Sequence, residues 1–208
     1  SPSGGPAEIL VSIPGKIERR YHGVLRVTPL PSELLLLIET DREVAVGSIV
    51  AAEVIEQTPI EALKAQAVVA RSFLAASEPR HKGFQFCDTT HCQFLRHWPP
   101  PDSAPYRAAE QTKDLVLTFH GSPFAPLYSA ACGGRTRALT EPDPGSRGYL
   151  YRSVDCAYCL RHPQDPKRGH SIGMCQQGAA GMAAHGASYR EILDHYYPGT
   201  SVTTLPVR

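Results

Sequence analysis

The stretch from Thr58 to Ala76 constrains the fold more than any other part of the chain. Its opening residues, Thr58-Pro59-Ile60-Glu61, have the pattern of a helix N-cap, a proline at the first helical position and a capping-box glutamate. Apolar residues then recur at alternating spacings of three and four, namely Ile60, Leu63, Ala67, Ala70 and Leu74. This pattern predicts an amphipathic helix with one buried stripe that ends near Ala76, before Pro79.

The residues before this helix favour strands. Short apolar runs separated by proline and glycine turns predict strands at 8–13, 21–28 and 34–40. The apolar run 44–53 continues this strand-rich part, which we expect to span 7–54 and to be followed directly by the helix.

The residues after the helix mix both kinds of element. We expect a β-hairpin from 115–119 and 124–130, short helices at 106–113 and 176–185, and irregular structure at 80–105. Ser188-Tyr189-Arg190-Glu191 is a second capping box, which predicts a final helix that ends before Pro198. Because strands and helices are mixed without βαβ alternation, the expected fold class is α+β.

The composition indicates a globular chain. Its 208 residues, 42% hydrophobic and 20% charged, are enough for one sizeable core or for two small, closely packed subdomains. We expect residues 7–208 to form a single domain after a disordered Pro/Gly/Ser leader, 1–6. A balance of 21 Lys+Arg against 20 Asp+Glu provides no basic field for nucleic-acid binding. All apolar stretches fall well short of the roughly 20 residues of a membrane span.

Four potential metal ligands, His81, Cys87, His91 and Cys92, fall within twelve residues. Two thiolates and two imidazoles are a donor set that zinc selects, and four protein ligands indicate a structural site. Adjacent ligands such as His91 and Cys92 are unusual. In an alternative arrangement, one of the two points away from the metal and His97 takes its place as a ligand. The other interpretation is a Cys87–Cys92 disulfide in an oxidising compartment.

The remaining cysteines leave several interpretations open. Cys156 and Cys159 form a CxxC motif, which is compatible with redox chemistry, half of a metal site or a disulfide. Redox chemistry needs a helix that starts at the first cysteine, and Pro163 argues against one. Cys132 is a further candidate for a disulfide or for a second metal site with this pair, whereas Cys175 stands alone.

Four segments in order resemble the stage II sporulation protein D (SpoIID) family, which includes amidase enhancers. Residues 61–72, EALKAQAVVARS, are similar to the family's EALKAQAVAART, and Glu53 stands eight residues upstream in the place of the glutamate of its EMP motif. The other similar segments are 128–134 (YSxSxGG in the family), 170–179 (GHGVGMSQxGA) and 189–199 (YxEILxHYYPGT). Departures are Val54-Ile55 in place of Met-Pro, Ser171 in place of Gly and Cys175 in place of Ser.

The resemblance implies a peptidoglycan lytic transglycosylase of the cell envelope, on its extracytoplasmic side, that cleaves glycan strands stripped of their peptides. It also implies zinc at His and Cys positions similar to those above, and a cell-wall amidase as a potential partner. The chemistry needs one carboxyl group, which acts as an acid and then as a base, whereas ordinary glycosidases need a positioned carboxylate pair.

Two glutamates compete for that role. Glu61 has a purely structural explanation as the capping-box partner of Thr58. Glu53 ends an apolar run, and its purely structural explanation is a strand-end carboxylate that points into solvent. The family motif favours Glu53 as the catalytic residue. Candidate substrate-binding residues are Gln66, Arg71, Tyr128, His170 and Gln176. Gln66 and Arg71 lie off the buried stripe of the predicted helix, so the alternative for both is a solvated polar face.

Two other functions remain open from the sequence. One is a glycan-binding or amidase-enhancing module without turnover, because the residues after Glu53 differ from the family motif. The other is a zinc hydrolase, against which four apparent protein ligands argue, since catalytic zinc keeps an open coordination position.

Overall fold

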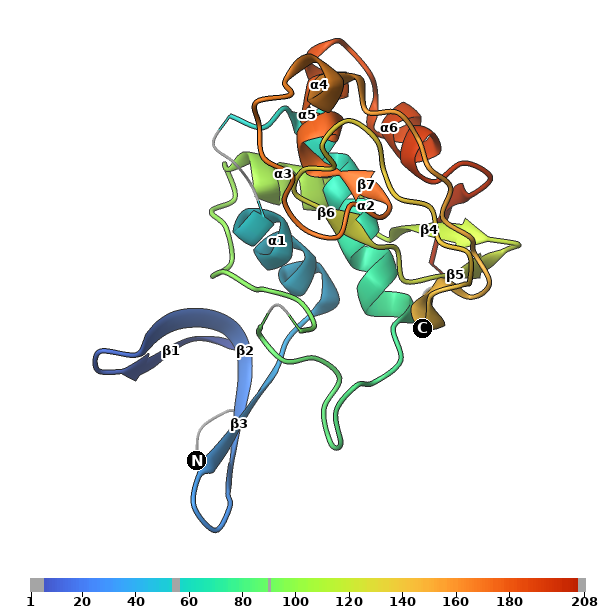
Figure 1. Ribbon diagram of the computed structural model, residues 1–208. Helices are drawn as coiled ribbons and strands as arrows, with labels where there is room; N and C mark the ends of the chain where they lie inside the picture. The colour runs from blue at the N-terminus through green and yellow to red at the C-terminus, as the bar shows by residue number, and fades with distance from the viewer. Residues whose placement is uncertain (1–5, 54–56, 90, 206–208) are drawn as a thin grey trace.

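The computed structural model describes residues 6–53, 57–89 and 91–205 and has an α+β fold (Figure 1). The helices are α1 (Arg42–Glu53), α2 (Ile60–Ala76), α3 (Ala104–Gln111), α4 (Ala157–Arg161), α5 (Gln176–Ala184) and α6 (Tyr189–Tyr196). The strands are β1 (Ala7–Ile13), β2 (Ile17–Pro29), β3 (Leu34–Glu39), β4 (Leu115–Phe119), β5 (Ser122–Pro123), β6 (Tyr128–Ser129), β7 (Met174–Cys175) and β8 (Ser201–Thr204). The predicted leader lies outside the described residues except for Pro6.

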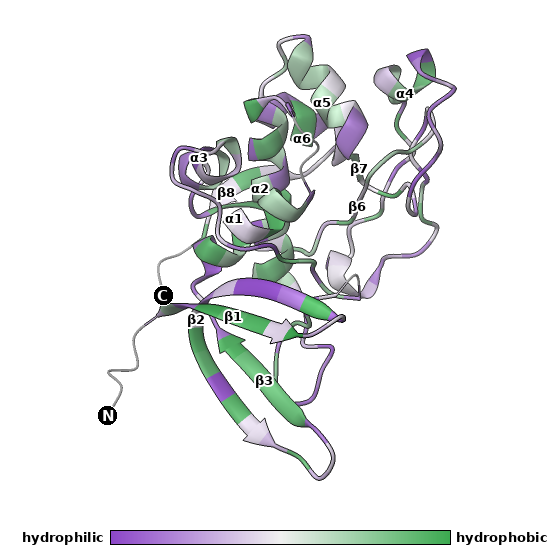
Figure 2. Ribbon diagram, turned by 90° about the vertical axis from the view of Figure 1, so that its left-hand side faces the viewer, coloured by the Kyte–Doolittle hydropathy of each residue, from purple (hydrophilic) through white to green (hydrophobic). Residues whose placement is uncertain are grey.

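The strands β1, β2 and β3 form an antiparallel meander that projects from the helical body as an arm (Figures 1 and 2). The first half of β2 pairs with β1, and from Val24 onward it pairs with β3. At the changeover, a side chain on Gly23 would collide with the backbone of Glu39, so only glycine fits there. The three strands predicted for this region are confirmed.

The prediction that the run 44–53 belongs to the strand-rich part is wrong, because these residues lie in helix α1. The Asp41 carboxylate accepts hydrogen bonds from the amides of Glu43 (2.7 Å) and Val44 (3.4 Å), which caps the helix. Residues from Ala45 to Val50 are all buried, so their sequence shows no periodicity. A continuous apolar run of this kind fits a buried strand and a buried helix equally well. The catalytic candidate Glu53 therefore ends a helix and not a strand.

The predicted helix α2 is confirmed, but two details differ. It begins at Ile60 with Pro59 as its N-cap, and Glu61 accepts hydrogen bonds from Lys64 Nζ (2.6 Å) and the Tyr189 amide (2.8 Å). The predicted capping-box role of Glu61 is therefore wrong. The helix is also buried on several sides and not along one stripe, because α1 and α3 pack on one side and α5, α6 and β4 on the other (Figure 1).

The expectation that Arg71 lies on a polar surface and binds substrate is wrong. Its side chain is fully buried, and its guanidinium forms an ion pair with Glu43 at 2.7 Å. It also donates to the backbone carbonyls of Ala109 and Leu115, both at 3.1 Å. A buried charge needs such a set of partners. Arg71 therefore joins α1, α3 and β4 to α2 and does not line a surface site.

The C-terminal half wraps α2 with short elements. β4 lies between β5 and β8, and β6 pairs in parallel with β7. The predicted hairpin forms only at β4 and β5, because residues 124–127 leave the sheet, and β8 was not predicted. The helices α3, α5 and α6 are confirmed, as is the capping box of Ser188 and Glu191. The short helix α4 begins directly after Cys156, contrary to the expectation drawn from Pro163.

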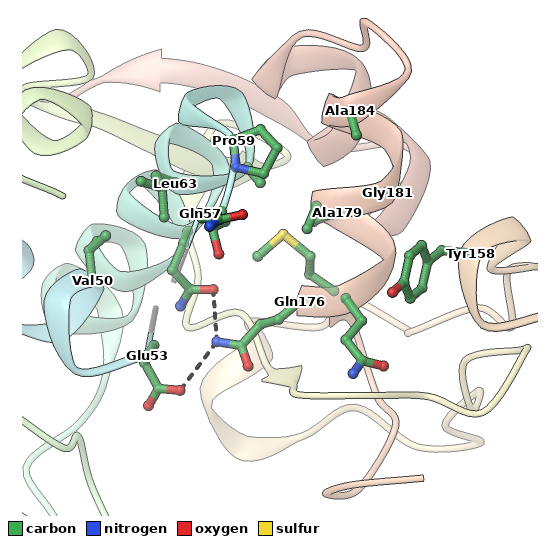
Figure 3. A pocket seen from close by; sticks show the side chains of 16 residues that line it. Val50, Glu53, Gln57, Pro59, Leu63, Tyr158, Gln176, Ala179, Gly181 and Ala184 are labelled. Atoms are coloured by element: carbon green, nitrogen blue, oxygen red, sulfur yellow. Dashed lines mark hydrogen bonds between the residues drawn. The ribbon is translucent and has the colours of Figure 1, made fainter. Parts of the chain in front are cut away.

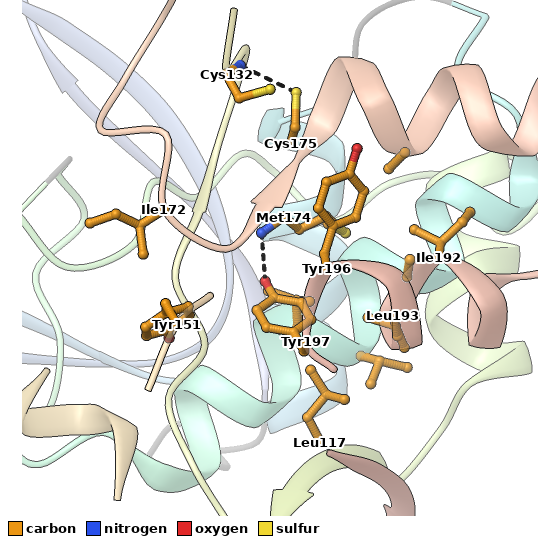
Figure 4. Close-up of a cluster of buried hydrophobic side chains, with 14 of the residues drawn as sticks. Leu117, Cys132, Tyr151, Ile172, Met174, Cys175, Ile192, Leu193, Tyr196 and Tyr197 are labelled. Atoms are coloured by element: carbon orange, nitrogen blue, oxygen red, sulfur yellow. Dashed lines mark hydrogen bonds between the residues drawn. The ribbon is translucent and has the colours of Figure 1, made fainter. Parts of the chain in front are cut away.

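The largest core cluster fills the space between α2, α5, α6 and β4 (Figure 4). It is rich in buried aromatic rings, and the hydroxyl of Tyr197 donates to the Leu127 carbonyl at 2.8 Å. A second cluster lies between α1, α2 and α3. In the part of the chain that the structure describes, no helix has the length and apolar character of a bilayer span.

Candidate active site and metal-ligand clusters

A cleft of about 390 Å³ lies between the end of α1, the start of α2 and the face of α5 (Figure 3). Its walls are mostly apolar, and its polar groups are chiefly glutamine amides. It is lined by Val50, Glu53, Gln57, Thr58, Pro59, Ala62, Leu63, Gln66, Tyr158, Met174, Gln176, Gln177, Ala179, Ala180, Gly181 and Ala184. Among these, Glu53 is the one acidic side chain.

The Glu53 carboxylate is held by two side chains from distant parts of the sequence. Tyr128 Oη donates to one carboxylate oxygen at 3.4 Å, and Gln176 Nε2 donates to the other at 3.2 Å. Glu53 is the last residue of α1, where the carbonyl ends of the helix make a negative charge unfavourable. A charge that destabilises the helix end on which it lies, and that faces a cleft, is expected to have a functional role.

The parallel pairing of β6 and β7 brings the two donors together. Tyr128 lies opposite Met174 and Ser129 lies opposite Cys175 in this pair. Gln176 follows β7 directly and is the first residue of α5. The start of one strand and the start of one helix therefore both face the end of α1.

Two further glutamines extend the network. Gln66 of α2 is only 5% exposed, and its Oε1 accepts from Gln176 Nε2 at 3.4 Å. Gln93 is equally buried, and its Oε1 accepts from Tyr128 Oη at 3.2 Å. The buried atoms Gln66 Nε2 and Gln177 Oε1 have no hydrogen-bond partner among the described residues. Buried polar atoms without partners at a cleft are expected to meet a ligand or water.

The environment of Tyr128 keeps its hydroxyl protonated. Burial raises the pKa of Tyr128 well above its ordinary value of 10, and the neighbouring Glu53 carboxylate raises it further. Tyr128 therefore acts as a hydrogen-bond donor to the carboxylate at any pH near neutrality.

Three of the predicted substrate-binding residues, Gln66, Tyr128 and Gln176, meet around Glu53, and their roles stay predictions. His170 Nδ1 accepts from the Ile172 amide at 3.0 Å, and its imidazole lies near the Tyr128 backbone and not among these side chains' hydrogen bonds. Burial, and then Arg137, lower the pKa of His170, so its imidazole is neutral at pH 7. Among the described side chains, no hydrogen bond joins His170 to Glu53. The neighbouring Ser171 has a φ of 59°, a left-handed conformation that explains the glycine at this place in the family motif.

Four residues of the cleft and its hydrogen-bond network were not predicted from the sequence, namely Gln57, Gln93, Gln177 and Tyr158. Tyr158 lies across the cleft from Glu53 and packs on Gly181 of α5 (Figure 3). Its ring also stacks on His162, with the ring centroids 4.1 Å apart. The sequence offers no signal for it beyond its position between the two cysteines of the CxxC motif.

The predicted ligands His81, Cys87, His91 and Cys92 do meet, and we refer to them as the His/Cys cluster. Their ligand atoms all lie within 4.8 Å of one another. His81 Nε2 is 3.2 Å from Cys92 Sγ, and His91 Nδ1 is 3.4 Å from the same sulfur. Both His91 and Cys92 therefore face the cluster, and His97, the alternative ligand, is not among its members.

The chemistry of this donor set fits a tetrahedral metal ion. The Thr89 hydroxyl, and then His91, lower the pKa of Cys87 to about 6, whereas burial raises the pKa of the neighbouring Cys92. Thiolate and imidazole are the ligand forms that such a metal requires. All six cysteines of the chain are free in the structure, including the Cys87–Cys92 pair considered for a disulfide.

The loop that carries the His/Cys cluster is attached to both the arm and the body. The Asp88 carboxylate accepts from Arg19 Nη1 (2.8 Å) and Tyr21 Oη (2.6 Å) of β2. On the other side, Trp98 packs against Gly47 of α1. The loop thereby places Gln93 beside Tyr128.

Comparisons with known proteins bear on this arrangement. Residues 32–119 match the model of the family described as SpoIID, stage II sporulation protein, which is less than half of the chain. Over 120 residues, the chain is 33% identical to a protein of Bacillus subtilis named amidase enhancer, covering 57% of this chain and 15% of that protein. Both matches support the resemblance to the SpoIID and amidase-enhancer family that the sequence indicated.

A second relative covers more of the chain. An uncharacterised protein of Brachyspira hyodysenteriae is 23% identical over 264 aligned positions, which cover 88% of this chain and 72% of that protein. The SpoIID match spans Glu53, α2 and the His/Cys cluster, whereas Tyr128 and Gln176 lie beyond its end.

Proposed function

We propose that this chain is a lytic transglycosylase of the cell envelope, acting outside the cytoplasm on peptidoglycan glycan strands stripped of their peptides. The observation that carries the proposal is the position of Glu53, the one acidic side chain among the described residues that line the cleft. Tyr128 and Gln176 orient its two oxygens. A cleft with one carboxylate suits this reaction, since ordinary inverting and retaining glycosidases use two.

In the proposed reaction, Glu53 donates its proton to the glycosidic oxygen as the bond between that oxygen and the anomeric carbon breaks. The primary hydroxyl of the same sugar then bonds to the anomeric carbon, and its proton passes to the Glu53 carboxylate. The products are a new chain end and an anhydro sugar, and Glu53 is again protonated. Gln66 and Gln177 both line the cleft, and we propose that their amides bind sugar hydroxyl or amide groups.

Zinc is the metal that we propose for the His/Cys cluster, where it holds a loop without helix or strand in place. Four protein ligands complete a tetrahedral shell, and none of them lines the cleft. A structural role therefore fits better than the zinc-hydrolase alternative. We propose that residues 7–208 act as one domain in this function.

The second candidate function is a glycan-binding module that stimulates a cell-wall amidase without cleaving glycan itself. The name of the Bacillus subtilis relative, amidase enhancer, favours it. The two functions share the cleft and differ in whether the purified chain shortens glycan strands.

The test is mass spectrometry of purified, peptide-free glycan strands after incubation with wild type, Glu53→Gln and Glu61→Gln. Glu61→Gln is the matched control, because it removes the same charge from a carboxylate that binds Lys64 and Tyr189 outside the network. We expect anhydro ends from wild type and control, and a loss of about 100-fold or more in rate for Glu53→Gln.

Each other outcome contradicts the proposal in its own way. Equal cleavage by Glu53→Gln would move the catalytic role elsewhere. Ordinary reducing ends would indicate hydrolysis. Strand binding without cleavage by the wild type would favour the amidase-enhancing module.

A further inference from the structure

Four buried cysteines meet beside the cleft, and we refer to Cys132, Cys156, Cys159 and Cys175 as the four-cysteine cluster. None is more than 4% exposed. Their Sγ atoms all lie within 4.8 Å of one another, and Cys159 Sγ is 3.6 Å from Cys175 Sγ (Figure 4 shows Cys132 beside Cys175). Sulfurs bound to one zinc ion at about 2.3 Å lie about 3.8 Å apart in a tetrahedron. The spacing therefore suits a single ion.

Polar hydrogens point at these sulfurs. The amides of Cys132 and Gly178 donate to Cys175 Sγ at 3.3 and 3.4 Å, and Tyr196 Oη donates to Cys156 Sγ at 3.4 Å. Such donors favour thiolates over thiols. Buried thiolates repel one another unless a cation lies between them, so the arrangement calls for a metal ion.

The backbone is built closely around the cluster. Cys175 caps α5, and the amide of Gly178 in that helix is one of its donors. A side chain on Gly178 would collide with Tyr196 Oη and Cys156 Sγ. This glycine therefore lets α5 approach the sulfurs.

Other uses of four cysteines fit less well. Disulfides require two close pairs and give no reason for all four sulfurs to converge. A redox-active CxxC needs an accessible thiol, and Cys156 and Cys159 are only 1% and 4% exposed. A multi-iron cluster would hold its thiolates farther apart, because iron and sulfide atoms lie between them.

We propose that the four-cysteine cluster binds one structural Zn²⁺ ion, distinct from the ion of the His/Cys cluster. This site would position two residues that line the cleft. Tyr158 lies between two of its ligands, and Gln176 directly follows a third. The proposal does not depend on the glycan-cleaving function.

The test is the zinc content of the full chain, purified without chelators, measured by mass spectrometry for wild type and Cys159→Ser. Wild type should hold two zinc ions per chain and Cys159→Ser one. His81→Ala is the matched control, because it should also lose one ion, from the other cluster.

A second measurement covers the case in which Cys159→Ser does not fold. Native mass spectrometry of the wild type, combined with thiol alkylation before and after chelation, identifies the cysteines that the metal protects. Protection of these four cysteines until chelation supports the site. A disulfide among them, their alkylation with zinc still bound, or an unchanged zinc content in folded Cys159→Ser would overturn it. A single wild-type ion that Cys159→Ser loses would support this site and remove the one proposed for the His/Cys cluster.

Discussion

The two groups of potential metal ligands are built in opposite ways. The His/Cys cluster comes from twelve consecutive residues of a loop, and three of its four members lie near solvent: His91 is exposed, and His81 and Cys87 are half-buried. The four-cysteine cluster comes from three segments between Cys132 and Cys175, and all of its members are buried. A metal ion in the first would replace the packing that a loop lacks, whereas one in the second would tie together segments that already pack.

Each cluster also borders the candidate active site from its own side. Gln93 follows Cys92, and Gln176 follows Cys175. Both glutamines belong to the network around Tyr128 and Glu53. If both clusters bind metal, the candidate active site is positioned by one local and one non-local crosslink, and the loss of each should destabilise a different part of the molecule.

The largest expected effect is on global stability. Cys159→Ser should lower the free energy of unfolding by about 3 kcal/mol or more, because it removes a ligand from a buried site within the main core. His81→Ala should change the same quantity by about 1 kcal/mol, since its loop has few packing contacts to lose. Denaturant unfolding followed by circular dichroism measures both.

Limited proteolysis further distinguishes the structural effects of the two substitutions. Cleavage of His81→Ala should be confined to residues 77–103, whereas Cys159→Ser should be cleaved throughout the body. Equal destabilisation by the two variants, or a more stable Cys159→Ser protein, would contradict the contrast between a local and a core site.

The next effect is on catalysis. Gln176→Ala removes a direct donor to Glu53 and should lower the cleavage rate by about 10- to 100-fold. Gln93→Ala, its counterpart beside the other cluster, removes only an acceptor for Tyr128 and should cost less than about 10-fold. Initial rates on peptide-free glycan strands measure both. A larger loss for Gln93→Ala would mean that the His/Cys side of the cleft controls the site.

The same contrast explains what the sequence could predict. The helix α2, the arm strands and the His/Cys cluster were predictable, because each depends on residues close together in the chain. Glu53 was identified through a family motif while its helix was mistaken for a strand, since residues 45–50 are buried on all sides and show no period.

Long-range pairings account for what was missed. The β6–β7 pair joins Tyr128 to Met174, and strands of only two residues have no local sequence pattern that predicts them. Cys175 looked isolated because its three partners arrive from other segments. Arg71 was expected at the surface because a charged residue is rarely buried, and its partner Glu43 lies in the helix that was not recognised.

The smallest expected effect concerns the arm, which contacts the loop of the His/Cys cluster through Tyr21 and Asp88. Burial, and then the hydrogen bond to Asp88, raise the pKa of Tyr21 to about 12 from an ordinary value of 10. Because the folded state holds this proton more tightly, its stabilising contribution is complete below pH 10 and disappears as the pH rises through about 12. Solvent exposure limits the contribution to about 1 kcal/mol.

Tyr21→Phe keeps the ring and removes the titrating hydroxyl, so it isolates this contribution. The wild type should be more stable than Tyr21→Phe by a constant amount up to about pH 10, and the two should converge toward pH 12. Ultraviolet difference titration should show one fewer late-titrating tyrosine in the variant. Denaturation should show the arm and the loop of the His/Cys cluster loosening together, with the four-cysteine cluster unaffected, because that cluster has no described contact with β2. A stability difference that stays constant through pH 12 would mean that the Tyr21 hydroxyl does not hold the arm to this loop, and the His/Cys cluster would then be as independent of the arm as its buried counterpart.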